Sequence, residues 1–540
     1  HTLTFDGAAG AWCSDICAVA VYPATAQDFE GPMEAYKDES LSYEERTADL
    51  ISRMTLEEKV SQLGRSAPAI PSLGVSAYNY WQEAVHGVAR NGKATSFPSS
   101  VSVANSWDPD MMRREADIIS SEARAKNNQY NLNYWSPTIN MQRDPRWGRN
   151  EESFSEDVYL TSVFGEAFVK GMQYGMEESG DYKKTIPTLK HFLANNTEGE
   201  RQRGTSIMTE DELRNYYTAA FRNVTESSDP GSVMSSYNAT TVTRNGVKIW
   251  DYIASPANRN TLTDLLRKNW GFKGFVVGDC GAVANLYSKG SFREGLYNSE
   301  KDGMFKDLEN FSQVTQPATV ALAIKAGNEL DCGPVSQDNG KAAVEEGYMT
   351  EGEIDAALYR VFLERFKTGE FDNNDKVKAY RSQFKTADLE KDESVAVAEE
   401  AAEKGIVLLQ NTKDSSGNTL LPLNKNNNLK IALIGEMAGQ AYLGDYSGSP
   451  EKTVSPYEEL QKVFGTENVD FLAHIEDGTV LFDEIESIIL VKGSKEEAVD
   501  LTKATQVNGM SLSGGKLTNV KVKSSLVIPS IDFKDVTEIK

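Results

Sequence analysis

A carboxylate follows directly after a short apolar run in the middle of the chain. Residues 271–283 read GFKGFVVGDCGAV, which has the composition of a buried strand up to Gly278 and then presents Asp279. A strand held in a core fixes the side chain at its end, so Asp279 would be aimed rigidly at whatever binds there. A carboxylate held in this way is suited to nucleophilic or acid–base chemistry.

Other strand-like runs also end in polar side chains. Lys190 and His191 lie at the end of PTLKHF, Tyr237 follows SVMSS, and Asp331 ends GNELD. The carboxyl ends of parallel strands lie on one rim of a barrel, so we expect these side chains beside Asp279. One such residue is more often an ordinary buried polar group, but four successive strand ends indicate an active site.

Aromatic residues lie beside a carboxylate in YNYWQEAVHGVAR, which contains Tyr78, Tyr80, Trp81, Glu83 and His86. Aromatic faces next to a carboxylate suit a sugar, which has apolar ring faces and a rim of hydroxyls. A half-buried aromatic helix face explains this stretch equally well.

Three arginines, Arg143, Arg146 and Arg149, lie among acids in RDPRWGRNEESFSED. A surface salt-bridge network is one interpretation, although the embedded Trp147 fits it poorly. Phosphate binding is another, but no glycine-rich phosphate loop accompanies the arginines. A part in the same active site is the third.

Retaining hydrolysis of a sugar needs one carboxylate that is ionised and attacks the anomeric carbon. Nearby cations and hydrogen-bond donors keep a carboxylate ionised. Lys190, His191 and Arg149 are the residues that would do so for Asp279.

The elements that position these residues form an alternating pattern. Thr-x-x-Glu capping boxes predict helices that begin after Thr55, Thr209 and Thr350. Strand-like runs alternate with helical stretches, which indicates a parallel sheet. A closed eight-fold (β/α)8 TIM-type barrel is the leading prediction, and an open doubly wound sheet is the alternative.

The organisation of the chain changes after the barrel. A charged stretch predicts a linker, the run LKIALIGEM opens a second α/β domain, and alternation with turns later indicates β structure. The strand-like pattern continues to Lys540, so we expect truncation there. The predicted parts are an N-terminal segment over 1–40, the catalytic barrel over 41–370, a linker over 371–394, the first part of an α/β sandwich domain over 395–474, and a β-rich inserted module over 475–540.

Composition limits the partners of the chain. Its 540 residues contain 80 acids against 56 bases, a net charge of -24, which disfavours nucleic acid and anionic membranes but not a neutral sugar. The four histidines are scattered and no two lie at ligand spacing, so no catalytic metal is predicted. No cofactor is predicted either. Cys280 and Cys332 each follow an aspartate at a predicted strand end, which makes them candidate neighbours and leaves their bonding open. The oligomeric state is not predicted.

The chain resembles glycoside hydrolase family 3 over residues 41–456. The matching motifs, in family order, are YNYWQEAVHGVAR, SPTINMQRDPRWGRNEESFSED, TLKHFLANN, VMSSYNA, GFVVGDCGAV and AGNELDCG. The resemblance implies a barrel followed by an α/β sandwich domain, and retaining hydrolysis through a glycosyl-enzyme on Asp279. It implies sugar-binding roles for Glu83, Arg149, Lys190, His191 and Tyr237.

Two positions indicate a subfamily. Glu83 and Cys280 stand where the β-xylosidase-like members have the same residues, whereas glucose-cleaving members often have aspartate and tryptophan. Glutamate reaches one methylene further and would occupy the room of a hydroxymethyl arm, a preference for pentose of about 1–3 kcal/mol. The N-acetylglucosaminidase branch has a histidine-containing loop that LANNTEGERQRG lacks.

No acid/base residue is identified. Glu436, Glu458 and Glu476 are available, but each is interpreted as a surface acid, and the acid/base is expected beyond Lys540. The leading hypothesis is a secreted bacterial exo-β-xylosidase acting on small neutral xylo-oligosaccharides outside the cell, at its surface or in the periplasm. The alternatives are a β-glucosidase with the same mechanism and a carbohydrate-binding fragment with little turnover.

Overall fold

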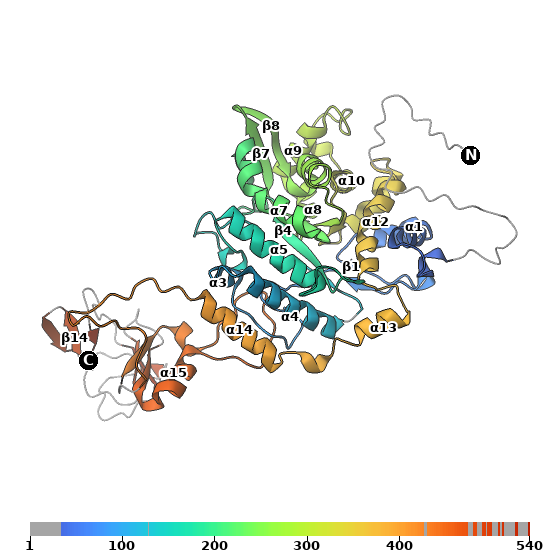
Figure 1. Ribbon diagram of the computed structural model, residues 1–540. Coiled ribbons are helices and arrows are strands. Elements are labelled where there is room, and N and C mark those ends of the chain that lie inside the picture. Colours follow the sequence, from blue (N-terminus) through green and yellow to red (C-terminus); the bar gives the residue numbers. More distant parts are fainter. Residues whose placement is uncertain are drawn as a thin grey trace. The chain divides into compact units, whose positions relative to one another are not determined.

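The computed structural model describes residues 34–472 apart from 128 and 426–428, and then 479–482, 489–492, 494–498, 506–507, 510–511, 524–527 and 538–539. The chain forms two compact units (Figure 1). The first consists of His1–Val407 and Tyr446–Glu451, and the second of Leu408–Asp445 and Lys452–Lys540.

A five-stranded parallel sheet in the order β10-β9-β6-β4-β3 is the centre of the first unit. Its short strands alternate with helices along the chain, as the sequence predicts. The strands are β3 (Asn133–Tyr134), β4 (Ile186–Phe192), β6 (Ser232–Ser235), β9 (Phe275–Gly278) and β10 (Leu330–Asp331).

Single bridges continue both edges of this sheet. Gly64 lies parallel to Asp331 at one edge, and Gln82 lies parallel to Tyr134 at the other. The strands that adjoin these bridges, β1 (Ser66–Ala67) and β2 (Tyr78–Asn79), pair with each other. The fold is therefore α/β and (β/α)8-like, as expected, but with five regular parallel strands instead of eight. Prolines and glycines between β1 and β2 explain the irregular part, since both interrupt strand ladders.

Helices surround the sheet, and all three predicted capping boxes are present. The hydroxyls of Thr55, Thr209 and Thr350 accept from the backbone N–H three residues later, and each glutamate there bonds back. The helices of this unit are α1 (Tyr43–Ser52), α2 (Leu56–Ser61), α3 (Ser100–Ala104), α4 (Pro109–Asn127), α5 (Val158–Tyr174), α6 (Glu210–Glu212), α7 (Ala219–Ser228), α8 (Ala282–Ser288), α9 (Gly290–Glu300), α10 (Gln316–Ala326), α11 (Val335–Glu345), α12 (Glu351–Lys367), α13 (Asp375–Arg381) and α14 (Asp392–Gly405).

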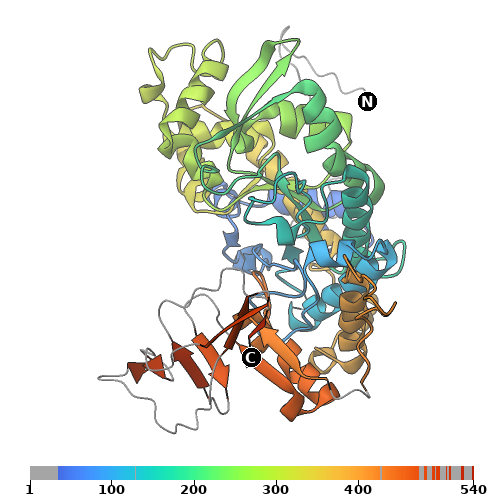
Figure 2. The same ribbon diagram turned by 90° about the vertical axis from the view of Figure 1, so that its left-hand side faces the viewer.

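Packing around the sheet makes its strands rigid. Helices α4 and α5 lie side by side (Figure 1), and their apolar side chains share a core cluster with β4, β6 and β9. All four residues of β9 are buried. A separate sheet contains β5 (Thr205–Thr209), β7 (Ala239–Arg244) and β8 (Val247–Ala254). Strands β7 and β8 form an antiparallel hairpin at one side of the unit (Figure 2), and β5 pairs in parallel with β7.

Residues 371–394, for which the sequence predicts a linker, contain α13 and the start of α14. The side chain of Asn374 caps α13, Val377 is buried, and Arg381 donates to the carbonyl of Gly369. The segment is therefore packed as a part of the first unit.

The second unit begins as an α/β structure, as expected. Strand β11 (Ile431–Ile434) pairs in parallel with β12 (Val469–Leu472), and α15 (Pro456–Phe464) connects them. Two antiparallel sheets follow within the region predicted to be β-rich. Their strands are β13 (Thr479–Phe482), β14 (Ile489–Lys492), β15 (Lys495–Ala498), β16 (Gln506–Val507), β17 (Met510–Ser511), β18 (Ser524–Val527) and β19 (Glu538–Ile539).

Most of the predicted N-terminal segment, with Cys13 and Cys17, lies outside the described residues, as do the stretches between the late strands. Within the described residues, no helix has the length and apolar character needed to cross a membrane.

Candidate active site

The register of the sheet brings the predicted strand-end residues together. Phe192 pairs with Ser235, and Ser235 pairs with Gly278, so the ends of β4, β6 and β9 lie in a row. Lys190 and His191 belong to the end of β4, Tyr237 follows β6 by two residues, and Asp279 directly follows β9. These side chains therefore lie on one rim, where such barrels carry their active sites.

Asp279 is held through one oxygen and free at the other. Its Oδ1 accepts from the backbone N–H of Cys280 at 2.7 Å. Its Oδ2 is buried and has no hydrogen-bond partner among the described residues. Burial raises the pKa of Asp279, whereas the charge of Arg149 and the N–H of Cys280 lower it. The unpartnered oxygen is the atom available for attack on a ligand.

A disulfide between Cys280 and Cys332 joins the ends of β9 and β10, which answers the question that the sequence left open. Cys280 contacts the site through its backbone on both sides. Its N–H donates to Asp279, and its carbonyl accepts from the hydroxyl of Tyr237 at 2.8 Å. The disulfide thus fixes the backbone that positions both side chains. Burial, and the nearby charge of Asp279, raise the pKa of Tyr237, which stays protonated.

Lys190 and Glu83 form a buried ion pair with 2.9 Å between Nζ and Oε2. The indole N–H of Trp81 donates to the other oxygen of Glu83 at 3.1 Å. Burial alone would lower the pKa of Lys190, but the carboxylates of Glu83 and Glu152 act together against it, and this pKa is raised. Lys190 is therefore a cation beside the rim.

Arg149 forms a second buried pair, with Glu152. Its Nε and Nη2 donate to the two oxygens of Glu152 at 2.7 and 2.8 Å. Burial opposes the charge of Arg149, but these hydrogen bonds raise its pKa. Sequence reasoning missed Glu152, although it follows Arg149 by three residues in the quoted arginine stretch.

His191 is expected from the sequence to help keep Asp279 ionised, as a cation or as a hydrogen-bond donor, and the structure shows that it is not a cation. Burial, and then the charges of Arg149 and Lys190, lower its pKa well below the usual value, so its ring is neutral. The side chain of Asn140 donates to the carbonyl of His191 at 2.9 Å, which turns its oxygen toward the ring Nδ1 at 3.1 Å. That oxygen accepts, so Nδ1 carries the proton and Nε2 faces Oδ2 of Asp279 at 3.7 Å as a lone pair. Asn140 was also missed from the sequence.

The structure separates the alternatives for the arginine stretch. Arg146 is exposed and paired with Asp144, which is the surface salt bridge. Arg149 belongs to the rim, and Trp147 is buried, donating to Glu198 at 3.0 Å.

The aromatic residues of YNYWQEAVHGVAR have two different locations. The stretch forms no helix, and Tyr78 and Tyr80 are buried in the core. Trp81 stacks on Trp135 with 5.7 Å between ring centroids and contacts Glu83.

The structure assigns no acid/base residue. Glu436 is exposed, and the carboxylate of Glu458 caps α15 by accepting from the backbone N–H of Ser455. Glu476 lies outside the described residues.

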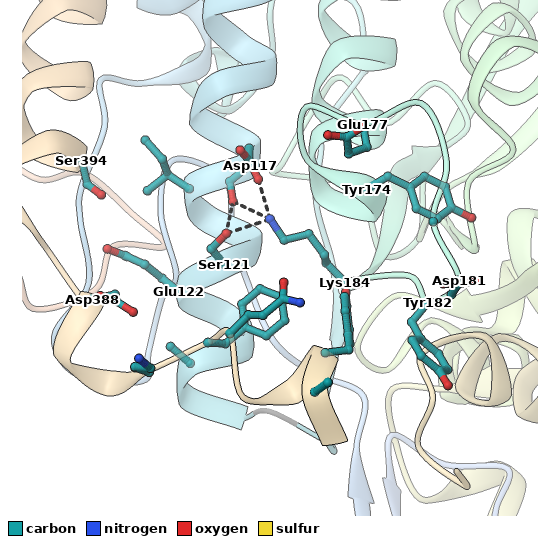
Figure 3. Close-up of a pocket in the computed structure, with 18 of the residues that line it drawn as sticks. Asp117, Ser121, Glu122, Tyr174, Glu177, Asp181, Tyr182, Lys184, Asp388 and Ser394 are labelled. Atoms are coloured by element: carbon teal, nitrogen blue, oxygen red, sulfur yellow. Dashed lines mark hydrogen bonds and ion pairs between the residues drawn. The ribbon is translucent and has the colours of Figure 1, made fainter. Parts of the chain in front are cut away.

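A cavity of about 800 Å³ lies elsewhere, between α4, residues 174–184 and α13. Figure 3 shows the ammonium of Lys184 directed at Asp117 and Ser121, both of which it contacts. None of the predicted site residues lines this cavity, and its buried lysine is already paired. The cavity is therefore separate from the rim chemistry.

The rim can carry out displacement at a carbon centre. It presents a rigid carboxylate with a free oxygen, flanked by two cations that are each neutralised by a glutamate. Carboxylate, cations and neutral imidazole can bind several hydroxyls of one sugar ring while the free oxygen faces its anomeric carbon. The described residues contain no cluster of three His, Cys, Asp or Glu side chains suited to a metal ion.

Comparison with known proteins agrees with this geometry. Curated relatives include probable beta-D-xylosidase 7 of Arabidopsis thaliana, with 34% identity over 77% of this chain and 52% of that protein. Xylan 1,4-beta-xylosidase of Xylanibacter ruminicola has 34% identity over 78% of this chain and 46% of that protein. Among solved structures, a GH3 exo-beta-xylosidase, XlnD, in complex with a xylobiose aziridine activity-based probe, has a TM-score of 0.70 at 29% identity. The match covers 84% of this chain and 55% of the XlnD chain.

The chain thus spans about half the length of the relatives that it matches. Family models match both parts of it. The model for the glycosyl hydrolase family 3 N terminal domain matches residues 75–363, and the model for the C-terminal domain of the same family matches residues 406–516. The chain therefore belongs to glycosyl hydrolase family 3.

Proposed function

We propose that this chain carries the nucleophile of a retaining, exo-acting glycosidase that releases β-D-xylose from the non-reducing ends of xylo-oligosaccharides. The observation that carries the proposal is the unpartnered Oδ2 of Asp279 between the Lys190–Glu83 and Arg149–Glu152 pairs. The xylosidase names of the relatives support the choice of sugar.

In the first step, Oδ2 of Asp279 forms a bond to the anomeric carbon while the bond to the leaving oxygen breaks. The leaving oxygen keeps the electron pair and takes a proton from a general acid, for which no residue of this chain is assigned. In the second step, the oxygen of a water molecule bonds to the anomeric carbon while the bond from that carbon to Oδ2 breaks. The water gives one proton to the conjugate base of the same general acid, xylose leaves, and Asp279 is again a carboxylate. Lys190 and Arg149 oppose the effect of burial on Asp279, which has to be ionised to attack.

The preference for a pentose rests on Glu83. Its carboxylate is fixed from both sides by Lys190 and Trp81, so it cannot swing aside for a larger sugar. A hydroxymethyl arm would meet a buried, charged group, and one such clash is worth about 1–3 kcal/mol. A β-glucosidase with the same mechanism is the alternative that the experiment tests.

The experiment is intact-protein mass spectrometry after incubation with 2,4-dinitrophenyl 2-deoxy-2-fluoro-β-xyloside. Dinitrophenolate leaves without protonation, so labelling of Asp279 needs no acid residue. We expect a mass gain of one fluoroxylosyl group that is absent in Asp279→Ala, with slower labelling by the gluco analogue.

Faster labelling by the gluco analogue would favour the β-glucosidase. No labelling of a folded chain by either reagent would leave the carbohydrate-binding fragment as the better description. Arg146→Met, which removes an exposed cation of the same stretch, is the control that should label normally.

The extracellular location and the bacterial origin stay predictions. The Cys280–Cys332 disulfide supports the location, because such bonds persist in oxidising compartments. Detection of the intact protein in culture medium, compared with the cell fraction, tests it.

A further inference from the structure

A short segment late in the chain packs on the first unit. Residues 446–451, here called the strap, belong to that unit although the residues on both sides belong to the second. The backbone N–H of Arg90 donates to the carbonyl of Ser447, and that of Ser449 donates to the carbonyl of Gly92 at 2.9 Å. The strap is thereby joined to the loop that follows Glu83.

Side chains and close packing hold the strap further. Lys93 pairs with Glu451 at 2.7 Å, and the backbone N–H of Glu451 donates to Glu390. A Cβ on Gly448 would lie 2.6 Å from the carbonyl oxygen of Val88, so only glycine fits there without displacing the strap.

The strap places the ring of Tyr446 over the cations of the rim. The ring centroid lies 4.6 Å from Nζ of Lys190, 4.9 Å from Cζ of Arg90 and 5.9 Å from Cζ of Arg149. Cations at these distances from an aromatic face are attracted by its negative charge. One ring therefore contacts a member of each buried ion pair of the site.

Two properties of Tyr446 indicate that its position is imposed by its surroundings. Its φ is 53°, a left-handed conformation that a bulky residue keeps only when its contacts hold it. Burial raises the pKa of its hydroxyl, so the ring stays neutral between the charged groups. A neutral ring excludes water from cations without neutralising them.

We propose that Tyr446 is a positioning residue, which acts on the sugar through Lys190 and Arg149 by shielding them from water and fixing their heads toward the rim. The inference rests on the proposed function. With the ring in place, these two cations are held where they can bind sugar hydroxyls. Without the ring, water solvates the cations and they move apart. The main effect of losing the ring is then weaker binding, because Asp279 keeps its own contacts with Cys280.

The test uses the kinetics of labelling by the dinitrophenyl fluoroxyloside, followed by intact mass over a range of reagent concentrations. Tyr446→Ala should raise the half-saturating concentration about 10- to 30-fold, which corresponds to the loss of two or three cation–π contacts. The maximal labelling rate should change less than about 3-fold, since the nucleophile is untouched.

Tyr446→Phe keeps the ring and should restore parent values. Gly448→Ala should reproduce Tyr446→Ala by displacing the strap. Tyr442→Ala is the matched control, because this tyrosine, which precedes the strap in the sequence, is 71% exposed. Near-ultraviolet circular dichroism shows whether each variant is folded.

The inference is overturned if the parent chain is labelled and Tyr446→Ala has the same half-saturating concentration, or if Tyr446→Phe is as impaired as Tyr446→Ala. A folded parent chain that is not labelled overturns the proposed function, and the inference with it.

Discussion

The two ends of β4 carry the same kind of buried charge in different surroundings. Lys183 precedes the strand and pairs with Glu364 at 2.9 Å; Lys190, at the other end, pairs with Glu83 at the same distance. All four side chains are at most 4% exposed. Neither burial nor pairing therefore distinguishes a structural lysine from one at the site.

What differs is the set of atoms that each end leaves unpartnered. Near Lys183, the second oxygen of Glu364 accepts from Lys367, and the guanidinium of Arg124 donates to backbone carbonyls around the strand start. Near Lys190, Oδ2 of Asp279 has no partner among the described residues. A fully satisfied network stabilises, whereas a free oxygen beside paired charges is where a ligand binds.

Replacing the two lysines should separate these roles most strongly. Lys190→Met leaves the buried Glu83 without its cation and should lower the free energy of unfolding by about 3–5 kcal/mol, whereas Lys183→Met leaves Glu364 paired with Lys367 and should lower it by less. Only Lys190→Met should slow fluoroxyloside labelling, by about 100-fold or more, because it removes a group that we propose to bind the sugar. Urea unfolding and intact mass measure the two effects.

Lys376→Met, which removes an exposed pair with Asp181, is the control and should change stability by less than about 1 kcal/mol. Equal slowing of labelling by Lys183→Met and Lys190→Met would show that the two ends are not different in function.

The disulfide is a constraint at the site end of the barrel. Cys280 and Cys332 are separated by 52 residues, and closing a loop of that length stabilises a fold by about 4 kcal/mol. The double variant Cys280→Ser/Cys332→Ser should lose about this much and should label more slowly, since the backbone of Cys280 contacts both Asp279 and Tyr237. Urea unfolding with and without reductant measures the first effect. An unchanged midpoint in both tests would contradict it.

Arg149 should set the pH dependence of the site. Burial raises the pKa of Asp279 and Arg149 lowers it, so the labelling rate falls as the pH drops through that pKa and the carboxylate is protonated. Arg149→Met removes the opposing charge, so the pKa of Asp279 rises and the acidic limb of the labelling rate moves to higher pH. The limb of Arg146→Met should stay where it is in the parent chain. If the acidic limb of the labelling rate moved to lower pH in Arg149→Met, the charge of Arg149 would not be lowering the pKa of Asp279.

Glu115 tests whether an unpartnered carboxyl group alone marks a site, since it lies away from the rim. Both of its oxygens are buried without a hydrogen-bond partner among the described residues, and burial raises its pKa well above the usual value. A raised folded pKa contributes stability that is fully present below the unfolded pKa and is lost as the pH rises through the folded one. Glu115→Gln removes this loss. The change in the free energy of unfolding that the substitution causes should therefore be more favourable at pH 7 than at pH 4, by about 1–2 kcal/mol.

Urea unfolding at both pH values checks this smallest effect. Glu122→Gln is the matched buried variant and should destabilise, because Glu122 accepts from Thr95 and from the backbone of Glu390. If Glu115→Gln were destabilising at pH 7, the carboxylate of Glu115 would be making an interaction that stabilises the fold.

Local patterns in the sequence predicted the parts of the fold that depend on local chemistry. The capping boxes at Thr55, Thr209 and Thr350 are such parts, because all partners lie within three residues. The strand ends were predicted for a related reason, since alternating strands and helices place Lys190 and Asp279 on one rim whatever the details.

The contacts that complete the site depend on register and on distant segments, and the sequence does not reveal them. Asn140 reaches His191 only because Thr138 lies beside Lys190. Tyr446 comes from a segment flanked by the other unit. The neutral state of His191 is not visible in the sequence, because complete burial, which decides it, is a property of the packed barrel.

Under the proposed function, the amide of Asn140 has a consequence for which sugars the site accepts. With the proton on Nδ1, two acceptors, Nε2 of His191 and Oδ2 of Asp279, face each other at 3.7 Å. A sugar hydroxyl placed there relieves this opposition only by giving its hydrogen to one of them. A methyl ether at the same position keeps the oxygen but has no hydrogen to give, so the site should discriminate against O-methylated sugars by hydrogen count as well as by size.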